Sequence, residues 1–323
     1  MDLIGKLEKN KKFMEKYNNY KKKKEVSEKA RRVKGTYQFI DRKKDSDKLC
    51  VILAGYKKLL WDDVFERLIK FAPKDMDVCI VSSGLYDETL NKIAEENNWS
   101  YLSLKQNKVT LVQNIAINLH PKAKLIYKID EDIFITKNFF SQLLETYERV
   151  EKESHYRIGF VAPLLPINGY SNVDVLEKTG LLEEFENKFG KAYHDGGANE
   201  KIIKNPDIAK FMWGETSEKL RNIDKLSEEF SKKEFEYSIC PIRFSIGAIL
   251  FSRDIWEDMG RFEVKAGANM GRDEAQMCLY CMIESKAIVV SENTIAGHFS
   301  YGPQTKAMEE YYKKNREVFK LKD

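Results

Sequence analysis

Lys124-Leu-Ile-Tyr-Lys-Ile-Asp-Glu-Asp-Ile-Phe-Ile135 is the stretch of sequence that most constrains the fold and the chemistry of this chain. Its apolar residues predict a strand that runs into the acidic triplet Asp130, Glu131 and Asp132. In an extended chain, side chains at i and i+2 point to the same side, so Asp130 and Asp132 should converge while Glu131 faces away. Two carboxylates at a strand end suit Mg²⁺ or Mn²⁺, which usually keeps coordination positions open for phosphate oxygens. The stretch therefore predicts a site for a metal-bound diphosphate.

The acidic triplet also has a purely structural interpretation. Acidic residues after a strand are common in turns and as caps of the next helix, and a helix is expected to begin near Asn138. The surrounding chain has to show whether Asp130 and Asp132 belong to a binding site.

The composition of the 323 residues is that of a globular protein with a substantial core, at 42% hydrophobic and 12% aromatic. No uncharged stretch reaches the roughly 20 residues that a membrane span needs, and the N-terminus lacks the apolar core of a signal peptide. The five cysteines are scattered and lie mostly in apolar runs, which favours reduced core residues, and the lone Cys278-x-x-Cys281 has no second pair to complete a zinc site. We expect a cytoplasmic protein.

Positive charge is concentrated at the N-terminus. Residues 1–48 hold 17 Lys and Arg against 8 Asp and Glu, a net charge of +9, within a total of +4 for the chain. Apolar residues recur there at helical spacing among the lysines: Leu3, Ile4, Leu7, Phe13, Met14, Tyr17 and Tyr20. We expect a basic amphipathic helical extension over residues 1–47, which either packs on the body or contacts an anionic membrane surface at the inner face of a membrane. No nucleic-acid-binding motif accompanies the charge, so nucleic acid is not an expected partner.

From Lys48 the chain alternates between strand-like and helix-like segments. Strands are predicted over 49–54, 77–82, 101–104 and 124–135, with a helix between each pair. This alternation predicts an α/β fold with a mostly parallel, Rossmann-like sheet flanked by helices. Such sheets bind ligands at the carboxyl ends of their strands. That edge is expected to collect Gly55 and Tyr56, Ser82 to Gly84, Lys105 to Asn107, and Asp130 to Asp132.

The second half of the chain is less regular. After a predicted strand over 158–163, residues 164–239 are too many for a simple connection and are expected to form a helical or irregular insert. Strand-like order returns at 244–252 and 287–290, and a terminal helix is predicted over 306–321. These boundaries divide the chain after the N-terminal extension into 48–163, 164–239, 240–305 and 306–323.

The order of these segments resembles the nucleotide-sugar glycosyltransferases of the GT-A fold, most closely the family 2 type, over residues 48–163 and 240–305. In the first half the resemblance rests on Leu53-Ala-Gly-Tyr56, on the helix that contains Asn114, and on Asp130-Glu-Asp132 at the place of the family's DxD motif. In the second half it rests on Gly247-Ala-Ile-Leu-Phe-Ser-Arg-Asp-Ile-Trp-Glu-Asp-Met-Gly-Arg-Phe262, on Gly271-Arg-Asp-Glu274 and on Gly297-His-Phe299.

The resemblance implies a nucleotide-sugar donor bound over the first strands and a Mn²⁺ or Mg²⁺ cofactor. The metal would be held by Asp132, with Asp130 acting through water or the ribose and His298 completing the shell. Donor contacts would come from Ala54, Gly55, Tyr56, Ser82, Asp87, Asn114 and Asp130. Residues 48–163 would be the donor half, 164–239 the acceptor-side insert and 240–305 the catalytic half.

The resemblance also implies a general base near Asp273 and Glu274. An inverting transfer needs a base to accept the proton of the acceptor hydroxyl, and family 2 members take it from an acidic pair, usually Glu then Asp, at the start of a helix. Here the order is reversed, so the base is left open between the two. The structural alternative is an acidic first turn favoured by the helix dipole.

The leading hypothesis is a metal-dependent, inverting hexosyl- or N-acetylhexosaminyltransferase. It would move a sugar from a UDP-sugar to a glycan or glycoconjugate acceptor in surface polysaccharide synthesis. The alternatives are a nucleotidyltransferase or sugar-nucleotide pyrophosphorylase, and a non-catalytic adaptor that uses the basic helix to reach a membrane or a partner.

Overall fold

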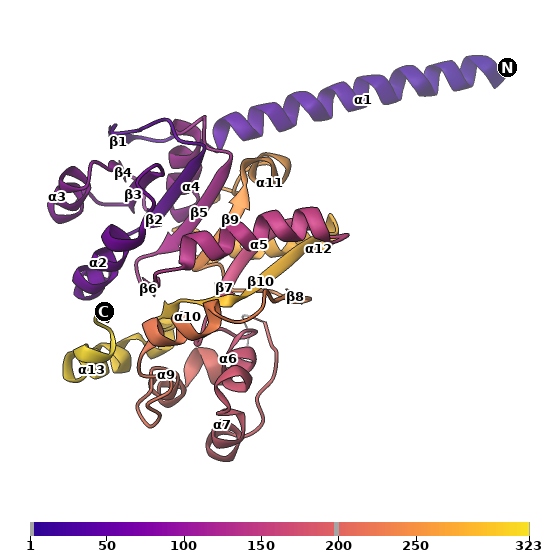
Figure 1. Ribbon diagram of the computed structural model, residues 1–323. Helices are drawn as coiled ribbons and strands as arrows, with labels where there is room; N and C mark the ends of the chain where they lie inside the picture. Colours follow the sequence, from indigo (N-terminus) through magenta and orange to yellow (C-terminus); the bar gives the residue numbers. More distant parts are fainter. Residues whose placement is uncertain (1–2, 197–199, 323) are drawn as a thin grey trace.

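A nine-stranded sheet forms the centre of the computed structural model, which describes residues 3–196 and 200–322 (Figure 1). The strand order is β1-β4-β3-β2-β5-β9-β7-β10-β8. The bounds are β1 Tyr37–Ile40, β2 Lys48–Leu53, β3 Asp77–Ser83, β4 Ser100–Leu104, β5 Leu125–Asp130, β7 Arg157–Leu164, β8 Tyr237–Cys240, β9 Ala248–Ser252 and β10 Lys286–Ile295. A separate two-stranded sheet pairs β6 (Ile133–Phe134) with β11 (Gly297–His298).

Six strands of the large sheet run in one direction. The pairs β4·β3, β3·β2, β2·β5 and β10·β7 are parallel, whereas β1, β9 and β8 run antiparallel to their neighbours. The predicted α/β class with a mostly parallel sheet is therefore confirmed. Strand β9 departs from a simple parallel sheet because it lies antiparallel between β5 and β7 and so joins the two halves of the chain.

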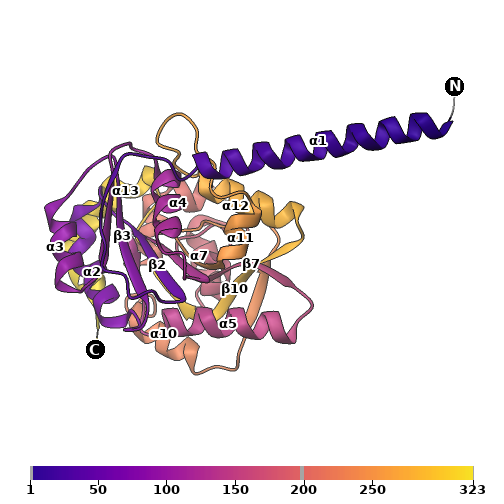
Figure 2. The same cartoon turned by 90° about the horizontal axis from the view of Figure 1, so that it is seen from above.

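Helices cover both faces of this sheet. Helices α5 (Phe139–Glu153) and α10 (Ile223–Ser231) lie on one face, and α4 (Val109–Leu119), α11 (Arg253–Asp258) and α12 (Arg272–Ile283) lie on the other (Figure 2). The remaining helices are α1 Leu3–Arg31, α2 Trp61–Phe71, α3 Glu88–Glu96, α6 Asn172–Thr179, α7 Leu182–Phe189, α8 Glu200–Lys204, α9 Pro206–Met212 and α13 Thr305–Lys314.

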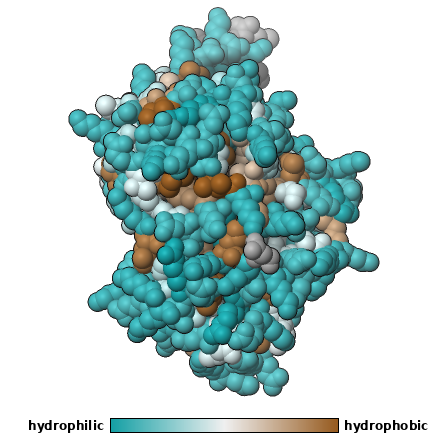
Figure 3. All heavy atoms as spheres, turned by 60° about the vertical axis from the view of Figure 1, so that its left-hand side comes forward, coloured by the Kyte–Doolittle hydropathy of each residue, from teal (hydrophilic) through white to brown (hydrophobic). Residues whose placement is uncertain are grey.

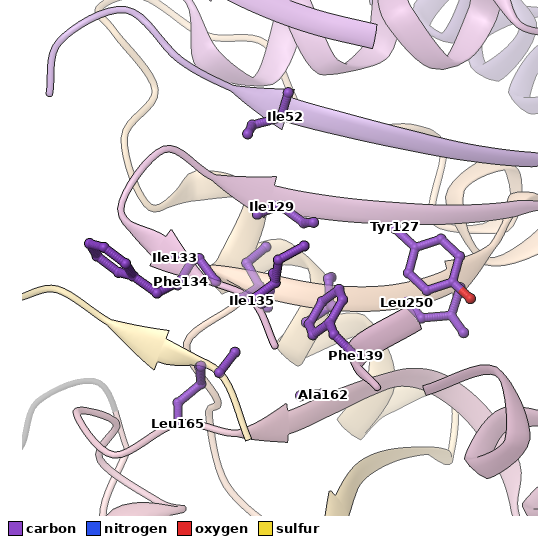
Figure 4. Packing of buried hydrophobic residues seen from close by; sticks show 14 of the residues in the cluster. Ile52, Tyr127, Ile129, Ile133, Phe134, Ile135, Phe139, Ala162, Leu165 and Leu250 are labelled. Atoms are coloured by element: carbon purple, nitrogen blue, oxygen red, sulfur yellow. The ribbon is translucent and has the colours of Figure 1, made fainter. Parts of the chain in front are cut away.

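The central strands are apolar because both of their faces are covered. Every residue of β3 is buried, as is typical of a parallel strand between two helical layers. The predicted strand over 124–135 breaks after Asp130 into β5 and β6, and Ile129, Ile133 and Ile135 join Phe139 and Leu250 in one apolar cluster (Figure 4). The acidic triplet therefore spans the last residue of β5 and the turn that follows it, and the surrounding core holds this turn on both sides.

The N-terminal segment contains two different structures. Helix α1 ends at Arg31 and projects away from the body in both ribbon views (Figures 1 and 2), whereas β1 is an edge strand paired with β4. The Arg32 guanidinium donates to the carbonyls of Gly260 and Arg261, which fixes the base of the helix. The helical part of the 1–47 extension is thus shorter than expected. No helix in the described part of the chain is both long and apolar enough to cross a bilayer.

Candidate functional site

A cavity of about 520 Å³ opens at the carboxyl ends of β2, β3 and β5. Its volume lies in the range of small-ligand sites. Its lining comes from both halves of the chain, and Figure 3 shows apolar residues gathered in a hollow between two largely hydrophilic lobes. The predicted site residues in the lining are Ala54, Tyr56, Asp130, Asp132, Asp273, Glu274 and His298. The cavity therefore lies at the carboxyl edge of the sheet, where the sequence predicted a binding site.

The pairing of β6 with β11 places His298 beside the acidic triplet. Gly297 pairs with Phe134 and His298 with Ile133, and the backbone N–H of Phe299 donates to the carbonyl of Asp132 at 2.9 Å. As a result, His298 Nε2 lies 3.5 Å from Asp132 Oδ2 although the two residues are far apart in sequence.

Trp213 of the insert holds β11 from its other side. Its indole Nε1 donates to the carbonyl of His298 at 3.1 Å, and its ring packs so closely on Gly297 that a Cβ there would lie 2.3 Å from a ring carbon. Only glycine fits at this contact. The insert therefore helps to position His298.

Each carboxylate of the DxD sequence is paired with a lysine. The Lys128 ammonium donates to Asp130 Oδ1 at 2.7 Å and to the Ile246 carbonyl at 2.8 Å. The Lys57 ammonium pairs with Asp132 Oδ2, the oxygen that also faces His298. Neither lysine was predicted as a site residue.

These contacts shift the pKa values of the two carboxyl groups in opposite directions. Enclosure in the cavity raises the pKa of Asp130 to about 6, because it outweighs the opposing charge of Lys128 and is reinforced by the negative charges of Asp132 and Asp273. Enclosure would also raise the pKa of Asp132, but the charge of Lys57, together with the neighbouring His298 ring, outweighs it and holds that pKa below its usual value. Asp132 is thus the carboxyl group of the two that loses its proton more readily.

Asp132 and His298 have the chemistry of a divalent-cation site. His298 Nδ1 lies 2.8 Å from the carbonyl of Ile167, which requires a proton on Nδ1 and leaves the lone pair of a neutral ring on Nε2. That lone pair faces a carboxylate oxygen, an arrangement that a cation between them would stabilise, and a carbonyl behind the ring is the usual support of a metal-binding histidine.

Asp130 fits the same cation less well because its Oδ1 is held by the buried Lys128, which the Ile246 carbonyl also fixes in place. Within residues 3–196 and 200–322, no three or more His, Cys, Asp and Glu side chains gather as they would around a metal ion. A metal held here would therefore rest on Asp132 and His298 and take its other ligands from a bound phosphate or from water.

The acidic pair at the start of α12 faces the cavity, but its two members have different partners. Asp273 is buried and its Oδ2 accepts a hydrogen bond from Gln113 Nε2 at 2.9 Å. Glu274 Oε1 is paired with the Arg243 guanidinium at 2.6 Å. One carboxylate thus has a neutral partner and the other a cationic one.

Glu131 is not the bystander that its outward position in the sequence pattern suggested. Its carboxylate accepts from the backbone N–H of Gly55 at 2.8 Å, from that of Tyr56 at 2.9 Å and from Trp61 Nε1 at 2.6 Å. It therefore fixes the loop after β2 to the end of β5. Glu131 also lines the cavity with Asp130 and Asp132, so it does not face away from them as the alternation of an extended strand predicts, and a local pattern could not show the distant groups that it meets.

Four predicted donor contacts lie outside the cavity lining formed by the described residues: Gly55, Ser82, Asp87 and Asn114. Asp87 caps α3 and pairs with Lys58, and the Ser82 hydroxyl donates to the carbonyl of Leu85. The Asn114 side chain is fully buried and bonded to backbone groups of Arg32 and Phe262 and to the Trp256 indole. Ser83 and Asn107 line the cavity in their place.

No protein-family model matches the chain, and no curated protein matches it. Solved structures that are similar include a crystal structure of GalNAc-T7 with UDP, GalNAc and Mn²⁺, at a TM-score of 0.45 and 12% identity over 79% of this chain and 44% of that one. The mannosyltransferase PcManGT from Pyrobaculum calidifontis, in complex with GDP-Man and Mn²⁺, has a TM-score of 0.46 and 12% sequence identity over 86% of this chain and 65% of that one. TarS 1-349 of S. aureus with UDP has a TM-score of 0.30 and 14% sequence identity over 36% of this chain and 35% of that one. The chain spans less than two thirds of the length of each of these structures.

Replacing Glu131 by Gln should destabilise the protein. Glutamine keeps one acceptor oxygen and turns an NH₂ group toward the remaining donors, so buried N–H groups lose their partners, at a cost of roughly 2–4 kcal/mol in the free energy of unfolding. Urea denaturation measures it. Glu95→Gln on the exposed side of α3 is the control and should stay within about 0.5 kcal/mol of the parent. Equal stability of the two variants would contradict the role assigned to Glu131.

Proposed function

We propose that this chain is a metal-dependent glycosyltransferase that moves a sugar from a nucleotide-sugar donor to a hydroxyl of a glycan or glycoconjugate. The observation that carries the proposal is the convergence of Asp132 and His298 on one point of a cavity that Asp273 and Glu274 also line. A cation site and an acidic pair in one cavity are the two parts that glycosyl transfer needs. A sugar-nucleotide pyrophosphorylase, whose attacking group is an already ionised sugar phosphate, needs no such base.

The donor would lie with its diphosphate at the cation site and its nucleoside over the ends of β2 and β3. Tyr56, Ser83 and Asn107 line that side of the cavity. The Tyr56 side chain is largely exposed, and its hydroxyl donates to the Ser83 carbonyl at 2.6 Å, so its ring is held at the cavity edge where a base could stack. UDP is the nucleotide we propose.

The reaction would form a bond between the acceptor oxygen and the anomeric carbon while the bond from that carbon to the diphosphate breaks. The acceptor hydroxyl gives its proton to a carboxylate, and the departing nucleoside diphosphate takes up negative charge. A bound Mn²⁺ or Mg²⁺ would act as a Lewis acid on that charge. Attack from the side opposite the diphosphate inverts the anomeric centre.

Asp273 is the base that we propose. A proton that moves onto Glu274 would break its ion pair with Arg243, whereas Gln113 can donate to Asp273 whether or not that carboxylate is protonated. Arg243 and Glu274 would then shape the acceptor side of the cavity.

Helix α1 would hold the enzyme at an anionic membrane surface. Phe13, Met14 and Tyr20 expose more than half of their side-chain surface on this projecting helix, and the exposed block Lys21 to Lys24 follows them directly. Aromatic residues next to lysines match the chemistry of an anionic lipid headgroup layer. A membrane-bound or lipid-linked acceptor would then be brought to the cavity.

The function is tested by thermal shift and donor hydrolysis with UDP-, GDP- and CMP-sugars, each with and without Mn²⁺. One donor with Mn²⁺ should raise the melting temperature and be hydrolysed slowly, since a ligand that binds only the folded state stabilises it. Asp132→Asn should remove both effects, because it replaces the anion that holds the metal. Asp75→Asn, which changes an exposed carboxylate in a loop, is the control. A full response from the Asp132 variant would refute the proposal.

The two candidate bases are separated by single substitutions. Asp273→Asn should lower the transfer rate by about 10²–10⁴ while leaving Mn²⁺ and donor binding intact. Glu274→Gln should lower it by about tenfold at most, because only the Arg243 contact is lost. The reverse order of the two rates would assign the base to Glu274.

Membrane contact is tested in the full chain by replacing Lys21, Lys22, Lys23 and Lys24 with Gln. Each lysine near an anionic surface contributes roughly 1 kcal/mol, so binding to phosphatidylserine vesicles should fall at least a hundredfold in a sedimentation assay. The control replaces four exposed lysines of the body, Lys92, Lys152, Lys306 and Lys313. Equal loss in both variants, or no binding by the parent, would exclude α1 as the membrane contact.

A further inference from the structure

Lys57 occupies the place that a cation at Asp132 would take. Its ammonium pairs with Asp132 Oδ2, and the same oxygen lies 3.5 Å from His298 Nε2. An ammonium group therefore already occupies the carboxylate oxygen that a metal ion between Asp132 and His298 would need.

The two lysines of the site differ in their freedom to move. Lys128 belongs to β5, exposes 4% of its side chain and has a second partner in the Ile246 carbonyl. Lys57 belongs to the loop between β2 and α2 and exposes 29% of its side chain. Lys128 is thus the fixed counterion of Asp130, and Lys57 is the one that can leave.

A divalent cation and the Lys57 ammonium cannot share Asp132 without strong repulsion. Charges a few ångströms apart in an enclosed cavity are poorly screened by water. A metal ion can therefore coordinate the Asp132 carboxylate only if Lys57 moves away. The diphosphate of the donor would bring two or more negative charges to the same place and so give Lys57 a new partner.

We propose that Lys57 makes metal binding depend on the donor: it neutralises Asp132 in the empty site and moves to the diphosphate when metal and nucleotide bind. This inference rests on the proposed function. Because coupling between two ligands is reciprocal, the nucleotide should tighten metal binding by the same factor by which the metal tightens nucleotide binding. Lys57 is the source of that coupling.

The test is Mn²⁺ binding by the full chain, followed by the electron paramagnetic resonance signal of free Mn²⁺, alone and with saturating UDP or GDP. In the parent, Mn²⁺ alone should bind weakly and the nucleotide should tighten it. In Lys57→Gln, Mn²⁺ alone should bind about tenfold or more tightly than in the parent, because its competitor is gone. Nucleotide affinity in the presence of Mn²⁺ should fall about tenfold or more in the same variant.

Two further variants separate this role from a general effect of charge or folding. Lys58→Gln changes the neighbouring lysine, which pairs with Asp87 outside the cavity lining, and should leave both affinities unchanged. Lys57→Arg keeps the charge and should restore weak binding of Mn²⁺ alone.

Unchanged or weaker binding of Mn²⁺ alone in Lys57→Gln would overturn the role of Lys57 while leaving the proposed function in place. A parent that binds neither nucleotide with Mn²⁺ would overturn both.

Discussion

The hydrogen bonds accepted by the Glu131 carboxylate are the constraint on which the site depends. Without them, the loop after β2 would have an unpaired buried N–H group at Gly55 and an unpaired, partly buried one at Tyr56. With them, that loop is joined to the turn after β5, and Lys57 follows directly from the anchored residues. The anchoring carboxylate comes from the middle of the triplet whose outer members face the cavity. One turn therefore provides both the binding groups and the support of the loop opposite them.

A second constraint brings the end of the chain to the same turn. The small β6·β11 sheet needs Gly297, because the Trp213 ring lies where any side chain would be. Trp213 belongs to the insert, so the insert, the DxD turn and β11 are packed as one unit. The position of His298 relative to Asp132 then follows from backbone pairing and not from a flexible loop, as a precise binding site requires.

Local patterns predicted the sheet and part of the site. The strands β2, β3 and β4 lie within about a residue of the predicted segments because continuous apolar runs are typical of strands covered on both faces. The rule that i and i+2 share a side placed Asp130 and Asp132 together, and applied one step further back it would also have found Lys128. The antiparallel direction of β9 and the partners of Glu131 and Asn114 depend on contacts between distant segments, which no local pattern contains. Asn114 was assigned to the donor only through the family resemblance of its helix, yet its side chain joins three segments of the core.

The two lysines of the cavity do not balance the negative charge of its carboxylates. Lys128 lies against Asp130, and still the pKa of Asp130 is raised to about 6, because enclosure and the like charges of Asp132 and Asp273 outweigh one ammonium ion. Arg243 neutralises Glu274 at the other side of the cavity. Among the described residues, Asp132 is flanked by Lys57, which exposes 29% of its side chain, and by a histidine whose protonated nitrogen points away from it. The cavity therefore lacks positive charge as a whole, and a divalent cation between Asp132 and His298 would supply it while freeing Lys57 for an incoming anion.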